Sequence, residues 1–175
     1  MIYIVLIIAV ALIIIVSFTK TSSSIPEIHE CENLRNVVMS LNYGRIYPYS
    51  TGISLKQIKQ MVKQRYKDTT KFDNHIQMCE LIGITSFVDL PETPNNIVGR
   101  ISLHFNRNNE VRSITIDIKN FEEKLQSLLN EMCLKFGNPA SIDSRFIIWR
   151  EKYMVINIDK ENGSISVLDE RQYGY

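Results

Sequence analysis

The fold is decided by residues 101–118, which read ISLHFNRNNEVRSITIDI. In each half of this stretch an apolar residue alternates with a polar one, as in a strand with one buried face. The apolar positions are Ile101, Leu103 and Phe105 in the first half and Ile114, Ile116 and Ile118 in the second. Residues 107–110 form a polar turn between the halves. The stretch therefore predicts a β-hairpin with one apolar face.

The residues after the hairpin predict a helix and three more strands. Asn120 and Glu123 begin the helix, apolar side chains recur at helical spacing as far as Phe136, and Gly137 and Pro139 end it. Alternating stretches then cover residues 145–150, 153–159 and 164–169. The order ββαβββ predicts an α+β fold, in which a largely antiparallel sheet carries one helix packed on it.

The residues before the hairpin predict two helices. The first covers about residues 25–41, because Ser24 and Glu27 fit a capping box ahead of an apolar stripe. The second begins at Ser54, which has Gln57 three residues later. We expect this two-helix segment to precede the sheet.

The connection to the hairpin is less regular. Residues 68–75 are polar and break the second helix. Residues 76–90 fit either a short helix at 76–82 or a strand, with extended structure favoured toward the end. The segment PETPNN at 91–96 is a loop and a possible sub-boundary. We expect residues 25–175 to form a single α+β domain.

The N-terminal segment predicts a membrane anchor. Of the first 18 residues 17 are apolar, and residues 2–18 carry no charge. Such a helix is about 26 Å long, near the short end of what crosses a bilayer core of about 30 Å. Its Ile, Val, Leu and Phe side chains favour insertion by roughly 4–8 kcal/mol. Because no basic residue precedes the apolar run, we predict an uncleaved transmembrane helix at residues 1–19 and a linker at 20–24.

The sequence does not decide on which side of the membrane the domain lies. Lys20 follows the predicted helix and no Lys or Arg precedes it, which favours a cytoplasmic domain by one or two charges. The three cysteines, Cys31, Cys79 and Cys133, do not decide the question. An odd number is compatible with one disulfide and a free thiol, or with three reduced thiols.

Composition excludes several classes of protein. With 7 Gly, 5 Pro and 22% charged residues, the chain is not a collagen, a coiled coil or a disordered protein. The net charge of +1 argues against a nucleic-acid partner. Common catalytic and nucleotide-binding motifs are absent from the sequence, and the cysteines are too far apart for a zinc site. We therefore expect no cofactor and no metal.

Two pairs of residues are compatible with an enzyme. His75 and Cys79 are four residues apart and would share one helical face as base and nucleophile. His104 and Asp117 lie on the polar positions of the predicted hairpin. A core cysteine and a surface hydrogen bond explain the same residues, so we assign no catalytic residue.

Lysines and tyrosines supply the predicted binding residues. Lys56, Lys59, Lys63 and Lys67 follow one stripe of the second helix, opposite its apolar face, where a solvated surface, a protein partner or lipid headgroups all suit them. The loop at 43–52 carries aromatic and guanidinium side chains of the kinds enriched in binding hot spots. They are Tyr43, Arg45, Tyr47 and Tyr49. Packing of these tyrosines onto the first helix is the alternative.

Taken together, the sequence predicts a single-pass membrane protein whose domain binds an unknown protein without catalysis. Its partners would be the lipid bilayer, through residues 2–18, and that protein. A specific form is an immunity-type protein that neutralises a toxin at the membrane. The alternatives are a membrane-tethered hydrolase-like enzyme and a structural or envelope-assembly subunit.

Overall fold

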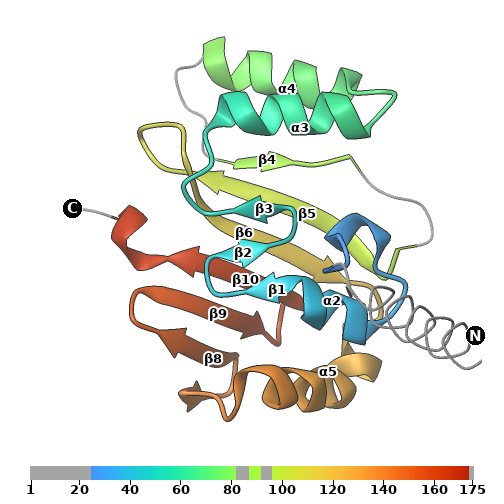
Figure 1. Cartoon of the computed structure of the whole chain (residues 1–175), viewed down its shortest axis with the longest axis vertical. Helices are drawn as coiled ribbons and strands as arrows, with labels where there is room; N and C mark the ends of the chain where they lie inside the picture. Colours follow the sequence, from blue (N-terminus) through green and yellow to red (C-terminus); the bar gives the residue numbers. More distant parts are fainter. Residues whose placement is uncertain (1–24, 82–86, 92–95, 174–175) are drawn as a thin grey trace, which may run out of the picture.

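The protein is described by a computed structural model over residues 25–81, 87–91 and 96–173. Seven strands form one antiparallel sheet in the order β4-β5-β6-β10-β9-β8-β7 (Figure 1). The predicted hairpin is confirmed as β5 (Val98–Phe105) and β6 (Val111–Ile118). Helices and antiparallel sheets are combined in one chain, which confirms the α+β class.

The three strands predicted near the C-terminus are also confirmed. They are β8 (Phe146–Glu151), β9 (Met154–Asp159) and β10 (Ser164–Asp169). Because β10 pairs with both β6 and β9, the last strand lies in the middle of the sheet. Short strands form the two edges, namely the expected extended segment β4 (Phe87–Asp89) and the unpredicted β7 (Ser141–Ile142). A 3-10 helix, η2 (Glu170–Tyr173), follows β10.

One face of the sheet is apolar and shares its core with α5 (Phe121–Phe136). The helix ends at Gly137, whose positive φ of 75° suits a residue without Cβ. It starts where predicted, with Asn120 at the N-cap, but Asn120 adopts a left-handed conformation and its side chain makes no capping hydrogen bond. The buried core residues of the sheet include Ile101, Leu103, Ile114, Ile116, Trp149, Ile156, Ile158, Ile165 and Val167.

A second, three-stranded sheet covers part of the same core. It consists of β1 (Leu41–Asn42), β2 (Arg45–Ile46) and β3 (Tyr49–Ser50), and it lies in front of β6 and β10 in Figure 1. We expected an irregular loop here. Strands of two residues are too short to show an alternating pattern, so the sequence did not reveal them.

The predicted helix at 25–41 is wrong in extent. The chain instead forms a 3-10 turn, η1 (Ile28–Glu30), and a separate helix, α2 (Leu34–Ser40), which lies against α5. Glu27 is extended rather than helical. The capping residue is Asn33, whose side chain accepts a hydrogen bond from the Asn36 N–H.

The next two helices stand beyond the β4 edge of the sheet (Figure 1). α3 (Leu55–Arg65) begins as predicted, with a reciprocal capping box between Ser54 and Gln57. α4 (Thr70–Leu81) begins within the polar stretch that we expected to break the helix. The hydroxyl of Thr69 donates to the Asp73 carboxylate, so polar side chains belong to its first turn.

The predicted anchor and linker lie outside the described residues. Among the helices within the described ranges, none is long and apolar enough to cross a membrane. Residues 92–95 of the predicted sub-boundary are also outside these ranges. The strands on either side of them, β4 and β5, pair in the same sheet.

Lys135, near the end of α5, binds the C-terminal end of α2. Its Nζ donates to the carbonyl oxygens of Val38 and Met39, each at 2.9 Å, and to that of Leu41. These carbonyls belong to a helix end, where intrahelical donors are missing. We expect Lys135→Met to lower the free energy of unfolding by about 1–2 kcal/mol. Urea denaturation measures this, and the exposed Lys63→Met variant should change stability by less than about 0.5 kcal/mol.

Candidate functional site

The residues predicted as a tyrosine loop divide between core and surface. Tyr49 is fully buried, so it belongs to the core rather than to an accessible surface. Tyr43 packs edge-on against Phe136, with 5.4 Å between ring centroids. Arg45 is exposed, and its guanidinium lies 4.8 Å from the centroid of the Tyr47 ring. Of the four predicted residues, Arg45 and Tyr47 therefore offer the accessible binding surface.

A buried histidine that sequence reasoning missed joins the small sheet to the end of α3. The Nε2 atom of His29 lies 2.7 Å from the Tyr49 hydroxyl, and its Nδ1 lies 2.6 Å from the Tyr66 hydroxyl. Burial lowers the pKa of His29 from 6.5 to about 4, so the ring is neutral at pH 7. One hydroxyl then donates to the ring, and the ring N–H donates to the other.

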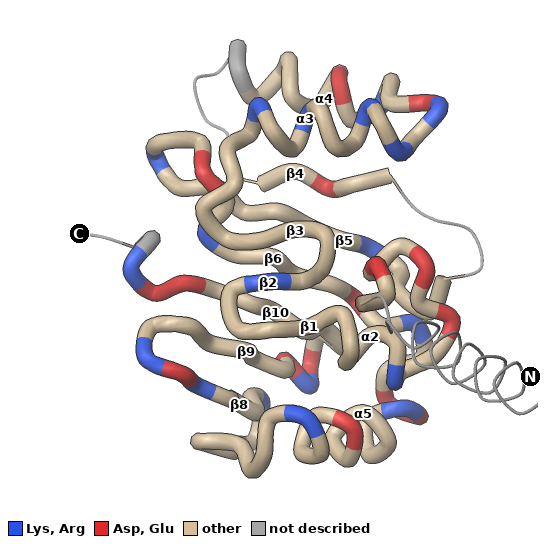
Figure 2. Tube along the Cα trace, in the orientation of Figure 1, with Lys and Arg blue, Asp and Glu red and all other residues tan. Residues whose placement is uncertain are grey.

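The four predicted lysines are not equivalent in the structure. Lys56 and Lys63 are exposed on α3, whereas Lys59 is half-buried. Lys67 is exposed but lies beyond the end of the helix, whose C-cap is Tyr66. The basic stripe thus continues from α3 into its connection with α4, as the blue positions in Figure 2 show.

The small sheet and α3 meet at a groove of about 430 Å³. Its lining residues are Glu27, Pro48, Tyr49, Met61, Gln64 and Arg65. Arg65 forms ion pairs with Glu27 and Glu30 beside this groove. None of the four predicted lysines is among the described residues that line it. Figure 2 shows the basic positions of α3 and its connection to α4 apart from β2, so the tyrosine loop and the basic stripe form two separate surfaces.

The first predicted catalytic pair is not assembled. The Nε2 atom of His75 lies 3.1 Å from the Phe87 carbonyl oxygen, to which it donates. Cys79 is a buried free thiol, and within the described part of the chain it has no hydrogen bond to His75. His75 is therefore not placed to activate the Cys79 thiol.

The second predicted pair is also separated. His104 is opposite Ser113 in the hairpin, whereas Asp117 lies four residues further along β6, or about 13 Å away. The Asp117 carboxylate instead binds Arg100, with a distance of 2.9 Å from Arg100 Nε. Burial lowers the pKa of His104, and the nearby Arg112 charge lowers it further.

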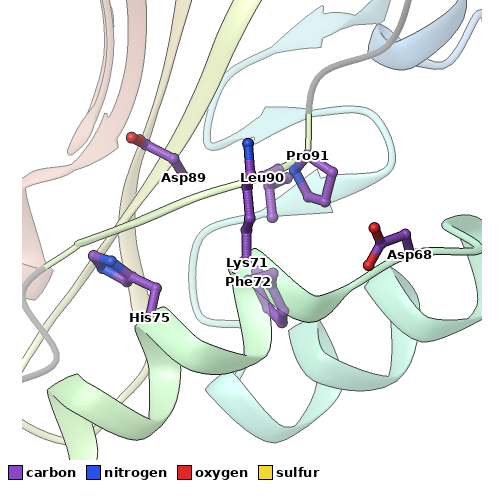
Figure 3. Close-up of a pocket in the computed structure, with 7 residues that line it drawn as sticks. All are labelled: Asp68, Lys71, Phe72, His75, Asp89, Leu90 and Pro91. Carbon is purple, nitrogen blue, oxygen red and sulfur yellow. The ribbon is translucent and has the colours of Figure 1, made fainter.

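A pocket of about 540 Å³ lies between α4 and β4 (Figure 3). Phe72 and Leu90 are 2% and 4% exposed and form its apolar floor. The remaining lining residues are Asp68, Lys71, His75, Asp89 and Pro91. Its volume is within the range of known ligand sites. We call it the α4–β4 pocket, and it was missed because both of its elements were ambiguous in the sequence.

Opposite charges flank this apolar floor. Lys71 comes from the first turn of α4 and Asp89 from β4, and neither forms an ion pair with another described residue. The Asp89 carboxylate accepts a hydrogen bond from the Ser102 hydroxyl. Asp68 accepts from the Thr70 N–H, which holds the pKa of Asp68 below its usual range. A ligand in the pocket would therefore meet one lysine and two carboxylates that already accept hydrogen bonds, together with apolar side chains.

Comparison with protein families matches the TP0088 domain over residues 46–172, which is more than half of the chain. The chain belongs to the TP0088 domain family. The matched region runs from β2 into η2 and includes the α4–β4 pocket, whereas His29 and the predicted anchor precede the TP0088 domain. No curated protein and no solved structure matches the chain. In the described ranges, no group of three His, Cys, Asp or Glu residues is arranged to hold a metal ion.

Proposed function

We propose that the chain is a non-catalytic protein-binding module held at the membrane by residues 2–18. The observation that carries this proposal is a set of exposed lysines on α3, in its connection to α4 and at the α4–β4 pocket. This basic surface consists of Lys56, Lys63, Lys67 and Lys71. Within the described residues none of the four forms an ion pair. Unpaired like charges beside an apolar pocket suit an acidic partner surface, because complementary charges accelerate and orient association.

Arg45 and Tyr47 provide a second contact region. Their stacked side chains combine an aromatic ring with a guanidinium, the two groups most frequent in interface hot spots. Since this region and the basic surface are separate, a partner contacts both only if it is large enough to extend around α3. A more specific form of the proposal is an immunity-type protein with a toxin as its partner, and an envelope-assembly subunit is the competing form.

Charge reversal tests the basic surface. We expect the double variant Lys63→Glu and Lys67→Glu to weaken partner binding about tenfold, which corresponds to about 1.4 kcal/mol. The measurement is photocrosslinking of the full chain in native membranes, with the crosslinked protein identified and its binding to each variant titrated. A toxin among the crosslinked proteins favours the immunity form, and an envelope protein favours the assembly form.

The matched control for this test is Arg35→Glu with Lys124→Glu, which changes the net charge equally. Arg35 is exposed on α2, and Lys124 is on α5, away from the basic surface. We expect this control to bind like the unmodified chain. Equal weakening by both double variants would show that net charge alone matters and would contradict the proposed surface.

Orientation in the membrane is tested by thiol labelling at an added cysteine. Cys31 is unsuitable, because it is fully buried and burial raises its pKa to about 12. Ser144 is exposed in the turn before β8, and Ser144→Cys in a Cys133→Ala background offers an accessible thiol. We expect a membrane-impermeant maleimide to label it only after lysis. Labelling in intact cells would place the domain outside.

A further inference from the structure

The outer edge of β4 presents backbone groups toward the α4–β4 pocket. β4 is an edge strand of the seven-stranded sheet, and the N–H of Leu90 donates to the Ile101 carbonyl at 2.8 Å. Because Leu90 bonds to β5 in an antiparallel pair, the residues one and three positions before it direct their backbone N–H and C=O groups away from β5. Those residues are Phe87 and Asp89. The Phe87 carbonyl accepts from His75 of α4, which agrees with this direction, and the Asp89 N–H and C=O lie along the same edge.

The side chains around this edge are complementary to an alternating peptide. In Figure 3, the Lys71 side chain extends from α4 toward β4, with Asp89 on one side of it and Leu90, Pro91 and Asp68 on the other. An extended chain that pairs with Asp89 would place successive side chains on opposite faces. Phe72 and Leu90 expose little area, so one such side chain would contact them together with Pro91. A carboxylate next to it can reach Lys71, for which Asp68 is the competing anion in the pocket.

Apolar surface continues beyond the pocket, which favours a peptide over a small molecule. The rings of His75 and Phe87 have centroids 5.7 Å apart, and Phe87 is 43% exposed. Met78, one turn further along α4, is 58% exposed. Aromatic and methionine side chains are enriched in protein interfaces. A ligand confined to the pocket would leave these two side chains in water.

We infer that the α4–β4 pocket binds an extended segment of the protein partner through strand addition at β4. The segment carries an apolar residue, seated on Phe72 and Leu90, and an acidic residue beside it that pairs with Lys71. This inference rests on the proposed function and specifies how the partner is recognised.

The test uses the full chain in lipid nanodiscs and two sets of blocked octapeptides. Each peptide has a central leucine, flanked by glutamate in one set and by lysine in the other. We expect the glutamate set to bind at least tenfold more tightly, as measured by fluorescence anisotropy. Lys71→Glu should reverse this preference, whereas Arg35→Glu, at an exposed position on α2 and outside the pocket, should keep it. Amide exchange at Asp89 should slow when the glutamate peptide binds.

Three results would overturn the inference. In the first, Lys71→Glu still prefers the glutamate peptides. In the second, amide exchange at Asp89 does not change when the peptide is bound. In the third, free glutamate or leucine displaces the peptide at a concentration similar to that of the peptide. Circular dichroism of each variant confirms that it is folded. If peptide binding fails while crosslinking to a partner still depends on Lys63 and Lys67, the strand-addition mode is wrong and the proposed function stands. If crosslinking to a partner also does not depend on Lys63 and Lys67, the proposed function is contradicted as well.

Discussion

Acidification from pH 7 to pH 4 should destabilise the domain by about 3 kcal/mol through His29. The unfolded chain takes up a proton on this imidazole near pH 6.5, whereas burial holds the folded-state pKa at about 4. Between these values the unfolded state binds more protons, so stability falls as the pH decreases through this window. Below the folded-state pKa no further loss comes from this group.

The structural reason is the surroundings of the ring. A protonated His29 would donate from both nitrogens, so both the Tyr49 and the Tyr66 hydroxyl would have to accept. The ion pairs of Arg65 with Glu27 and Glu30 are nearby, but burial is the cause that dominates the shift in pKa. We expect the segment at 27–31 to separate from α3 before the main sheet unfolds, because these contacts join the two.

Denaturation of the full chain in detergent at several pH values measures this effect. Trp149 is the only tryptophan and is buried, so its fluorescence reports unfolding. His29→Phe should cost about 1–3 kcal/mol at pH 7, because the Tyr49 and Tyr66 hydroxyls each lose a hydrogen bond to the ring, and it should remove most of the pH dependence. His104, whose pKa burial also lowers, contributes in the same direction. The variant His104→Gln measures that share, and a His29→Phe protein that loses as much stability as the unmodified chain would contradict the assignment.

The parts of the fold that could be predicted are those with a sustained local period. In β6, Ile114, Ile116 and Ile118 alternate over enough residues to define a face. α5 has four turns of apolar spacing and a glycine at its end. In both cases the pattern that forms the element also provides its contact with the core, so local and tertiary preferences agree.

The parts that could not be predicted depend on contacts between distant residues. His29 is 20 residues from Tyr49 and 37 from Tyr66, and no spacing rule links them. The polar residues at the start of α4 suggested a break in the helix. The helix forms nevertheless, because its residues Phe72 and Ile76 are buried in the core, although no continuous apolar stripe marks them in the sequence. The α4–β4 pocket exists only once that helix stands beside the sheet edge.

The binding residues show the same division. The lysine spacing indicated an exposed face of α3, because a buried lysine is costly and the opposite face is apolar. Lys56 and Lys63 lie on this face, whereas Lys59 is half-buried and Lys67 lies beyond the helix. The tyrosines are different, since a tyrosine suits a core and a surface equally well. Tyr49 is buried and Tyr47 is half-buried, although they are two residues apart in the same short hairpin. Only the tertiary structure separates them.

Replacement of Trp149 should give the largest loss of stability among single substitutions in the sheet. Its side chain is 1% exposed on β8, and its Nε1 donates to the Gly137 carbonyl at 2.9 Å. The residue therefore fills the core and also holds the C-terminal end of α5 against the sheet. We expect Trp149→Ala to lower the free energy of unfolding by about 3–5 kcal/mol.

Trp149→Phe separates the two contributions, because phenylalanine keeps an aromatic ring in the core but cannot donate to Gly137. We expect this variant to lose about 1–2 kcal/mol, from one hydrogen bond and a reduced volume. Far-ultraviolet circular dichroism during urea denaturation measures both variants, since the fluorescent residue is removed. If the two substitutions cost the same, the hydrogen bond rather than the packing would stabilise this junction. Amide exchange at the end of α5 should then increase equally in both, whereas a packing role predicts a larger increase in Trp149→Ala.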